Sequence, residues 1–143
     1  DFAPPDNNQT TTYVIDDLSI AVTLPADWYA PEADGELYYS ANPDEDTYFY
    51  IYVVVDVETV EDAIAYLVDI YGLELTSDFI PVLVGGYDAT EFEFIFDDQA
   101  GIGVALMMDD TTALIFSVEG FVSDNLRDWY EAIILEGIEF LGE

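Results

Sequence analysis

Carboxylates are the side chains that this sequence offers for chemistry. Of 143 residues, 32 are Asp or Glu and one is basic, which gives a formal net charge of −31 at pH 7. Two carboxylates that flank a bond can hydrolyse a glycoside, and two aspartates that share a proton can hydrolyse a peptide. With so many acids, neighbouring pairs arise by chance. Asp110-Thr111 lacks the glycine that follows Asp-Thr in aspartic proteases. We therefore expect no enzyme activity.

The residue types that are missing exclude other classes of site. The chain has no His, Cys or Lys, so it cannot build a Ser–His or Cys–His nucleophile or a Schiff base. Zinc, copper and haem sites normally need His or Cys. One arginine cannot neutralise a row of phosphates, and an anionic membrane surface would repel the chain. We expect no organic cofactor, no nucleic-acid partner and no anionic membrane surface as a partner.

Calcium is the cofactor that the composition leaves open, because hard divalent cations take several oxygen ligands. The first candidate site is Asp44, Glu45 and Asp46, three acids in one turn between strands. The second is Asp109 and Asp110, in a later hairpin turn. Aspartate is also common in turns because it hydrogen-bonds its own backbone. Solvated turns and a calcium site are both compatible with the sequence.

A row of tyrosines is the candidate recognition surface. Tyr48, Tyr50 and Tyr52 alternate with apolar residues and so share one face of a predicted strand. Tyrosine combines a large apolar area with a polar tip, which suits a ligand platform or a subunit interface. A row of this kind also packs beneath helices, and the sequence leaves both interpretations open. Arg127, the one cation, is expected to pair with Glu131 one helical turn on or with Asp124.

Strands of alternating polarity must position these residues. The pattern predicts that Thr47–Val55 is an inner strand, because both of its faces are largely apolar. It predicts an antiparallel meander over the three long strands in the second half of the chain. A loop is expected over Pro25–Gly35. The predicted strands are Tyr13–Ile15, Leu18–Leu24, Glu36–Ser40, Thr47–Val55, Phe79–Val84, Tyr87–Phe96, Ile102–Met108, Thr112–Glu119 and Ile138–Leu141.

Two helices complete the predicted elements. Thr59 is the expected N-cap of the first and Gly72 its stop. Ser123 is the expected N-cap of the second, which has Leu126, Trp129, Tyr130, Ile133 and Ile134 as its apolar stripe. The order of elements predicts a single α+β domain over residues 13–143, with a single antiparallel β-sheet and helices packed on it. Residues 1–12 are expected to form a polar spacer or assembly tail.

Two stretches resemble PsbP-like domains, a family that includes the photosystem II extrinsic protein PsbP and bacterial exported lipoproteins. One runs from Gly85–Phe94 through the acidic turns to Trp129–Ile134 and Ile138–Phe140. The other is Leu18–Trp28, which ends in Leu24-Pro25-Ala26-Asp27-Trp28. The resemblance implies an α/β/α sandwich and an accessory or binding role. The basic residues that some members of the family use to dock on partners have no counterpart in this sequence.

The charge and the N-terminal segment give the expected location and role. Self-repulsion at −31 would be relieved by high salt, low pH or bound cations. A polar, proline-bearing start suggests a chain that has lost a signal peptide, and hence export to the cell surface or beyond. Phe2 is the only large apolar residue of the tail, so we expect a neighbouring chain to hold it. We predict a structural or self-assembling subunit, such as a homo-oligomer. The alternative is a PsbP-like accessory or ligand-binding lipoprotein.

Overall fold

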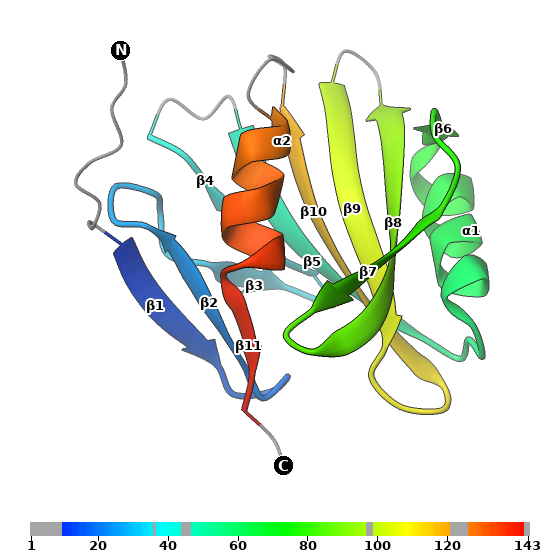
Figure 1. Ribbon diagram of the computed structural model, residues 1–143, viewed down its shortest axis with the longest axis horizontal. Coiled ribbons are helices and arrows are strands. Elements are labelled where there is room, and N and C mark those ends of the chain that lie inside the picture. The colour runs from blue at the N-terminus through cyan, green and yellow to red at the C-terminus, as the bar shows by residue number, and fades with distance from the viewer. Residues whose placement is uncertain (1–9, 36, 44–46, 97–98, 121–125, 142–143) are drawn as a thin grey trace.

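The structure is a computed structural model that describes residues 10–35, 37–43, 47–96, 99–120 and 126–141. Two antiparallel sheets and two helical segments make up this part of the chain, so the predicted α+β class is confirmed (Figure 1). The prediction of a single sheet is wrong, because the strands divide into sheets of three and eight.

The larger sheet has the order β3-β4-β5-β10-β9-β8-β6, and β7 also pairs with β8. The predicted meander is confirmed by β8, β9 and β10, which are paired in sequence, and β5 lies between β10 and β4 as an inner strand. The strands of this sheet are β3 (Glu32–Asp34), β4 (Leu37–Ala41), β5 (Thr47–Val55), β6 (Glu74–Leu75), β7 (Ile80–Val84), β8 (Tyr87–Phe96), β9 (Gln99–Met107) and β10 (Thr112–Gly120).

The smaller sheet joins the two ends of the described chain. It consists of β1 (Thr10–Ile15), β2 (Ile20–Pro25) and β11 (Ile138–Phe140), with β2 in the middle. Alternation predicts that each of these strands has a buried side, but it carries no information about which strands pair. Strand β1 begins at Thr10, so the last residues of the predicted tail take part in this sheet.

Helix α1 (Val60–Tyr71) has the boundaries that the sequence predicts. The Thr59 hydroxyl accepts a hydrogen bond from the Asp62 backbone N–H at 3.1 Å, and Gly72 ends the helix in the left-handed region with φ of 71°. The second helical segment consists of α2 (Leu126–Trp129) and a π-helical turn, η1 (Tyr130–Leu135). Its expected N-cap, Ser123, lies outside the described residues. No helix in the described ranges is long and apolar enough to cross a bilayer.

The large sheet is covered differently on its two faces. On one face, the small sheet and the second helical segment enclose the larger core, which includes Phe49, Phe116 and Tyr130. In Figure 1, the second helical segment lies in front of the large sheet, beside the small sheet. On the other face, α1 packs against β8, β9 and β10 through Ala63, Ile64 and Leu67.

The region expected to be a loop, Pro25–Gly35, contributes to the structure more than its turn residues indicate. It contains the short strand β3, which pairs with β4. Trp28 is buried, and its ring lies 5.2 Å from that of Trp129, between ring centroids. The segment therefore connects the edge of the large sheet to the second helical segment.

Candidate functional site: the tyrosine strip

Strand β5 places three tyrosines on the face of the large sheet that carries α1. Their rings form a stack with centroid separations of 6.0 Å between Tyr48 and Tyr50 and 5.7 Å between Tyr50 and Tyr52. The ring of Tyr71, from the last turn of α1, lies 5.7 Å from that of Tyr52. These four residues are called the tyrosine strip. The predicted row on one strand face is confirmed, and a tyrosine from the helix extends it.

The strip lies beside the helix rather than beneath it. Helix α1 packs against β8, β9 and β10, whereas Tyr48, Tyr50 and Tyr52 are on β5 and remain half-buried. Tyr39 on β4 is paired with Tyr50, and its hydroxyl donates to Glu32 Oε1 at 3.2 Å. The aromatic surface thus continues toward the β3 edge of the sheet, where acidic side chains border it.

A buried carboxylate belongs to the same face. Glu119 on β10 is paired with Tyr48 and is 5% exposed. Its Oε2 accepts hydrogen bonds from the Tyr52 hydroxyl at 3.2 Å and the Ser117 hydroxyl at 3.1 Å. No donor from the described ranges reaches its Oε1. Within the described residues, this buried carboxylate therefore has two hydroxyl donors on one oxygen and no cationic partner.

Burial determines the ionisation of this group of side chains. Loss of solvent raises the pKa of Glu119 to about 7, and the hydrogen bonds from Ser117 and Tyr52 oppose that rise in part. Burial and then the charge of Glu119 raise the pKa of Tyr50 to about 12, and both raise that of Tyr52 as well. Tyr50 and Tyr52 are therefore neutral hydrogen-bonding groups at physiological pH, while Glu119 changes charge near neutrality.

A second buried glutamate lies on the opposite face and has a different partner. Glu91 on β8 is 5% exposed; its Oε2 lies 3.1 Å from Arg127 Nη2, and its Oε1 accepts from the Tyr130 hydroxyl at 2.8 Å. Arg127 also pairs with Glu93 at 2.7 Å. The predicted Arg127–Glu131 pair is wrong, because the guanidinium reaches across to β8 rather than along its own helix. The other expected partner, Asp124, lies outside the described residues.

The predicted calcium ligands remain a prediction. Asp109 and Asp110 lie in the turn between β9 and β10, where Asp109 Oδ1 accepts the Thr111 backbone N–H at 2.9 Å. That bond is the ordinary role of aspartate in a turn. Within the described ranges, no three acidic side chains gather in an arrangement that could hold a metal ion. Asp44, Glu45 and Asp46 lie outside those ranges, as does the expected interface residue Phe2.

Sequence reasoning missed the contributions of Glu119, Ser117 and Tyr71 to this surface. Ser117 and Glu119 are two residues apart and so lie on the same face of β10. Only the register of β10 against β5 places them opposite Tyr50 and Tyr48. The one signal in the sequence that could have pointed to Glu119 is its place at the end of the predicted strand Thr112–Glu119. Tyr71, in the last turn of α1, is 41% exposed and contacts Tyr52, which helical spacing alone does not reveal.

Comparison with solved structures identifies the fold. The solution structure of cyanobacterial PsbP (CyanoP) from Synechocystis sp. PCC 6803 superposes with a TM-score of 0.68 at 8% identity, over 98% of this chain and 97% of that one. LpqN of Mycobacterium tuberculosis, involved in cell envelope biogenesis, gives a TM-score of 0.62 at 16% identity, over 96% and 94%. A Bacteroides thetaiotaomicron structure gives 0.61 at 15% identity, over 94% of this chain and 50% of that chain.

The sequence matches no protein-family model and no curated protein. The similarity therefore concerns the backbone: over nearly its whole length, the chain has a PsbP-like fold. The resemblance noted in the strand and turn patterns is confirmed at the level of fold.

Proposed function

We propose that this PsbP-like chain is a non-catalytic, exported domain that binds a protein partner bearing basic side chains through the tyrosine strip. The observation that carries the proposal is a half-buried aromatic row beside a buried carboxylate that no cation of the described residues neutralises. Aromatic rings and carboxylates together favour Lys and Arg, because the ring face attracts a cation and the carboxylate accepts its hydrogen bonds.

The chain's own charge argues for a basic partner. A surface of net charge −31 attracts cationic proteins over long range and repels a second copy of itself. The one arginine of the chain is held by Glu91 and Glu93 on the other face, so it cannot serve the strip. A homo-oligomer, our expectation from the sequence, would need salt or acid to weaken that repulsion. Self-association through the strip is therefore the competing hypothesis.

Other features support the remaining parts of the proposal. The sequence lacks the histidines, cysteines and lysines on which many catalytic centres depend. LpqN, which shares the fold, is involved in cell envelope biogenesis, and this supports a location outside the cytoplasm. An accessory role, in which the domain acts by binding, agrees with the missing catalytic residue types and with a location outside the cytoplasm.

The test uses trilysine as the probe and amide NMR shifts as the readout. At fixed ionic strength, trilysine should perturb the amides of β5 and β10 around Tyr50 and Ser117 more than those elsewhere. Tyr50→Ser should weaken binding several-fold. Tyr87→Ser is the matched control, because Tyr87 is 51% exposed on β8 and has the parity of Glu91, on the other face of the sheet.

Two results would overturn the proposal. Uniform shifts over the whole surface, unchanged by Tyr50→Ser, would mean that the acidic surface attracts trilysine without a site. If light scattering shows oligomers that grow with salt and disappear in Tyr50→Ser, the strip binds a second copy of the chain instead.

A further inference from the structure

A second surface, separate from the tyrosine strip, is a cleft between the two sheets. It has a volume of about 410 Å³ and lies between the turn that joins β1 to β2 and the β3–β4 hairpin. Tyr38 lines the cleft and packs against the larger core, whereas its neighbour Tyr39 lies on the opposite face of the sheet, with the tyrosine strip. Small-molecule sites commonly have volumes of about 300–1,000 Å³. The cleft therefore has room for a small ligand.

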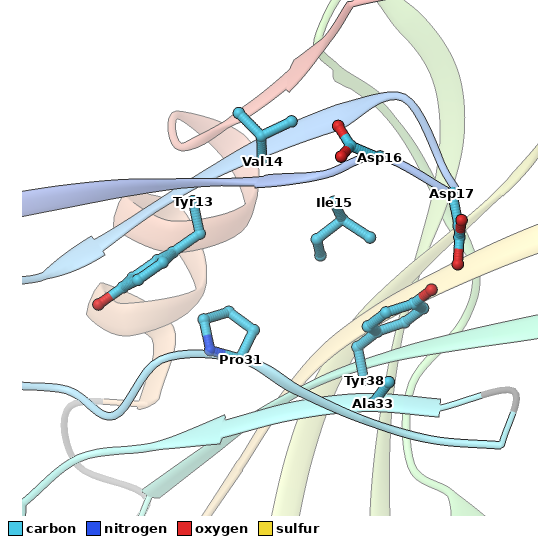
Figure 2. Close-up of a pocket in the computed structure, with 8 residues that line it drawn as sticks. All are labelled: Tyr13, Val14, Ile15, Asp16, Asp17, Pro31, Ala33 and Tyr38. Atoms are coloured by element: carbon cyan, nitrogen blue, oxygen red, sulfur yellow. The ribbon is translucent and has the colours of Figure 1, made fainter.

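Strand alternation separates the side chains of β1 and its turn into two groups. In Figure 2, Tyr13, Ile15 and Asp17 are directed into the cleft, toward Pro31 and Tyr38. Val14 and Asp16 also line the cleft but are directed away from Pro31 and Tyr38, and Val14 is 56% exposed. The cleft thus has apolar and aromatic walls and one inward carboxylate, Asp17, which remains exposed to solvent.

The inward carboxylate lies next to a tyrosine hydroxyl. Figure 2 shows the Asp17 carboxylate beside the hydroxyl of Tyr38. Burial, followed by the charge of Asp17 and a hydrogen bond with it, raises the pKa of Tyr38. In the described chain, Arg127 is the only basic side chain, and it is held on β8 by Glu91 and Glu93. No cation of the described part neutralises Asp17.

We propose that this cleft binds a small organic monocation, an ammonium group joined to a flat or cyclic apolar body. The ammonium donates hydrogen bonds to Asp17 and lies near the ring of Tyr38, which adds a cation–π attraction. The apolar body lies against Tyr13, Ile15 and Pro31.

Other ligand classes fit this cleft less well. An anion would be repelled by Asp17 and by the charge of the whole chain. A divalent metal ion takes six or more oxygen ligands and gains nothing from apolar walls. A neutral apolar molecule could not make a charge-assisted hydrogen bond to Asp17.

Benzylamine, which is cationic at pH 7, is the probe, and benzyl alcohol is its neutral counterpart of similar shape. Titration at constant ionic strength, followed by amide NMR, should show benzylamine shifting the resonances of Tyr13, Ile15 and Tyr38. Because the cleft is open and the probe small, we expect a dissociation constant in the millimolar range. Benzyl alcohol should bind at least about tenfold more weakly, since it lacks the charge-assisted hydrogen bond.

Two variants of the same turn give a matched comparison. Asp17→Asn should weaken benzylamine binding about fivefold, whereas Asp16→Asn removes the same charge from a side chain directed away from Tyr38 and should change it less than about twofold. Circular dichroism of both variants checks that they fold. Equal binding of benzylamine and benzyl alcohol would overturn the proposal. So would equal effects of the two variants, or shifts spread over the whole surface. None of these readouts depends on the tyrosine strip.

Discussion

The two faces of the large sheet each bury one glutamate, and the two carboxylates are stabilised in opposite ways. Glu91 has a guanidinium at 3.1 Å and a tyrosine hydroxyl at 2.8 Å. Glu119 has two hydroxyls and no cation from the described chain. Both are 5% exposed. Because the chain has one basic residue, only one buried carboxylate can be neutralised internally. The other must take up a proton or receive a cation from outside.

The difference separates a structural face from a candidate binding face. The Glu91 face is closed by the second helical segment and the small sheet, and its ion pairs connect that helix to β8. The Glu119 face is closed by α1 over β8, β9 and β10, and its tyrosines remain half-buried. A buried acid without a counter-ion costs stability, and acids with strongly perturbed pKa values are common at functional sites. Both points support the proposed cation-binding role.

The largest expected effect is the pH dependence of folding due to Glu119. The folded protein holds this proton up to about pH 7, whereas the ordinary pKa is 4.5. The resulting stability is fully present below about pH 4.5 and is lost as the pH rises through 7. The loss should be about 3 kcal/mol, measured by urea unfolding between pH 4.5 and 8.

Glu119→Gln isolates this contribution from the general repulsion among the other acids. The variant should lose less stability over the same pH range and should be more stable than the native protein at pH 8. Glu91→Gln is the matched variant on the other face. If all three proteins show parallel pH profiles, the buried Glu119 carboxyl does not titrate as described.

Removal of the one cation should have the next largest effect. Arg127→Leu leaves Glu91 buried without a counter-ion, and the free energy of unfolding at pH 7 should fall by about 2 kcal/mol. This is less than for a fully buried pair, because the Arg127 side chain is 42% exposed. Urea denaturation measures the loss. Glu91→Gln in the Arg127→Leu background should restore part of it. An unchanged midpoint in Arg127→Leu would show that Tyr130 alone is sufficient to stabilise Glu91.

Calcium should act at the turns rather than on either face. If Asp109 and Asp110 take part in a cation site, calcium at ten times its dissociation constant should add about 1.4 kcal/mol to stability. Magnesium at equal ionic strength should add less, because it prefers a tighter octahedral site. Thermal melts of native protein and of an Asp109→Asn, Asp110→Asn variant make the measurement. Equal effects of calcium, magnesium and sodium chloride would mean that the turns are solvated.

Sodium chloride should give the smallest effect. Screening weakens the Arg127 pairs but also weakens the repulsion among 32 acids, and at a net charge of −31 the repulsion outweighs the attraction. The melting temperature should therefore rise by a few degrees between about 0.01 M and 1 M salt. A melting temperature that falls with salt would indicate that the Glu91–Arg127 cluster outweighs the net charge.

The local elements of the fold could be predicted because their signals are local. Thr59 and Gly72 bound α1 through their own backbone and side-chain preferences, and alternation located β5 and β8 at their observed limits. The π-helical turn at Tyr130–Leu135 has no such signal. The second sheet was missed since Ile138 pairs with Val22, and period-two alternation does not identify a partner so distant in sequence.

The candidate site divides in the same way. The sequence by itself determined that Tyr48, Tyr50 and Tyr52 share a face, because a strand has a period of two. It also determined that almost no cation is present to neutralise the acids. Only the tertiary structure decided that Arg127 meets Glu91 and that Glu119 meets Tyr52. Those contacts depend on strand register and helix placement. Burial of many apolar side chains fixes both, and no local pattern of charges encodes them.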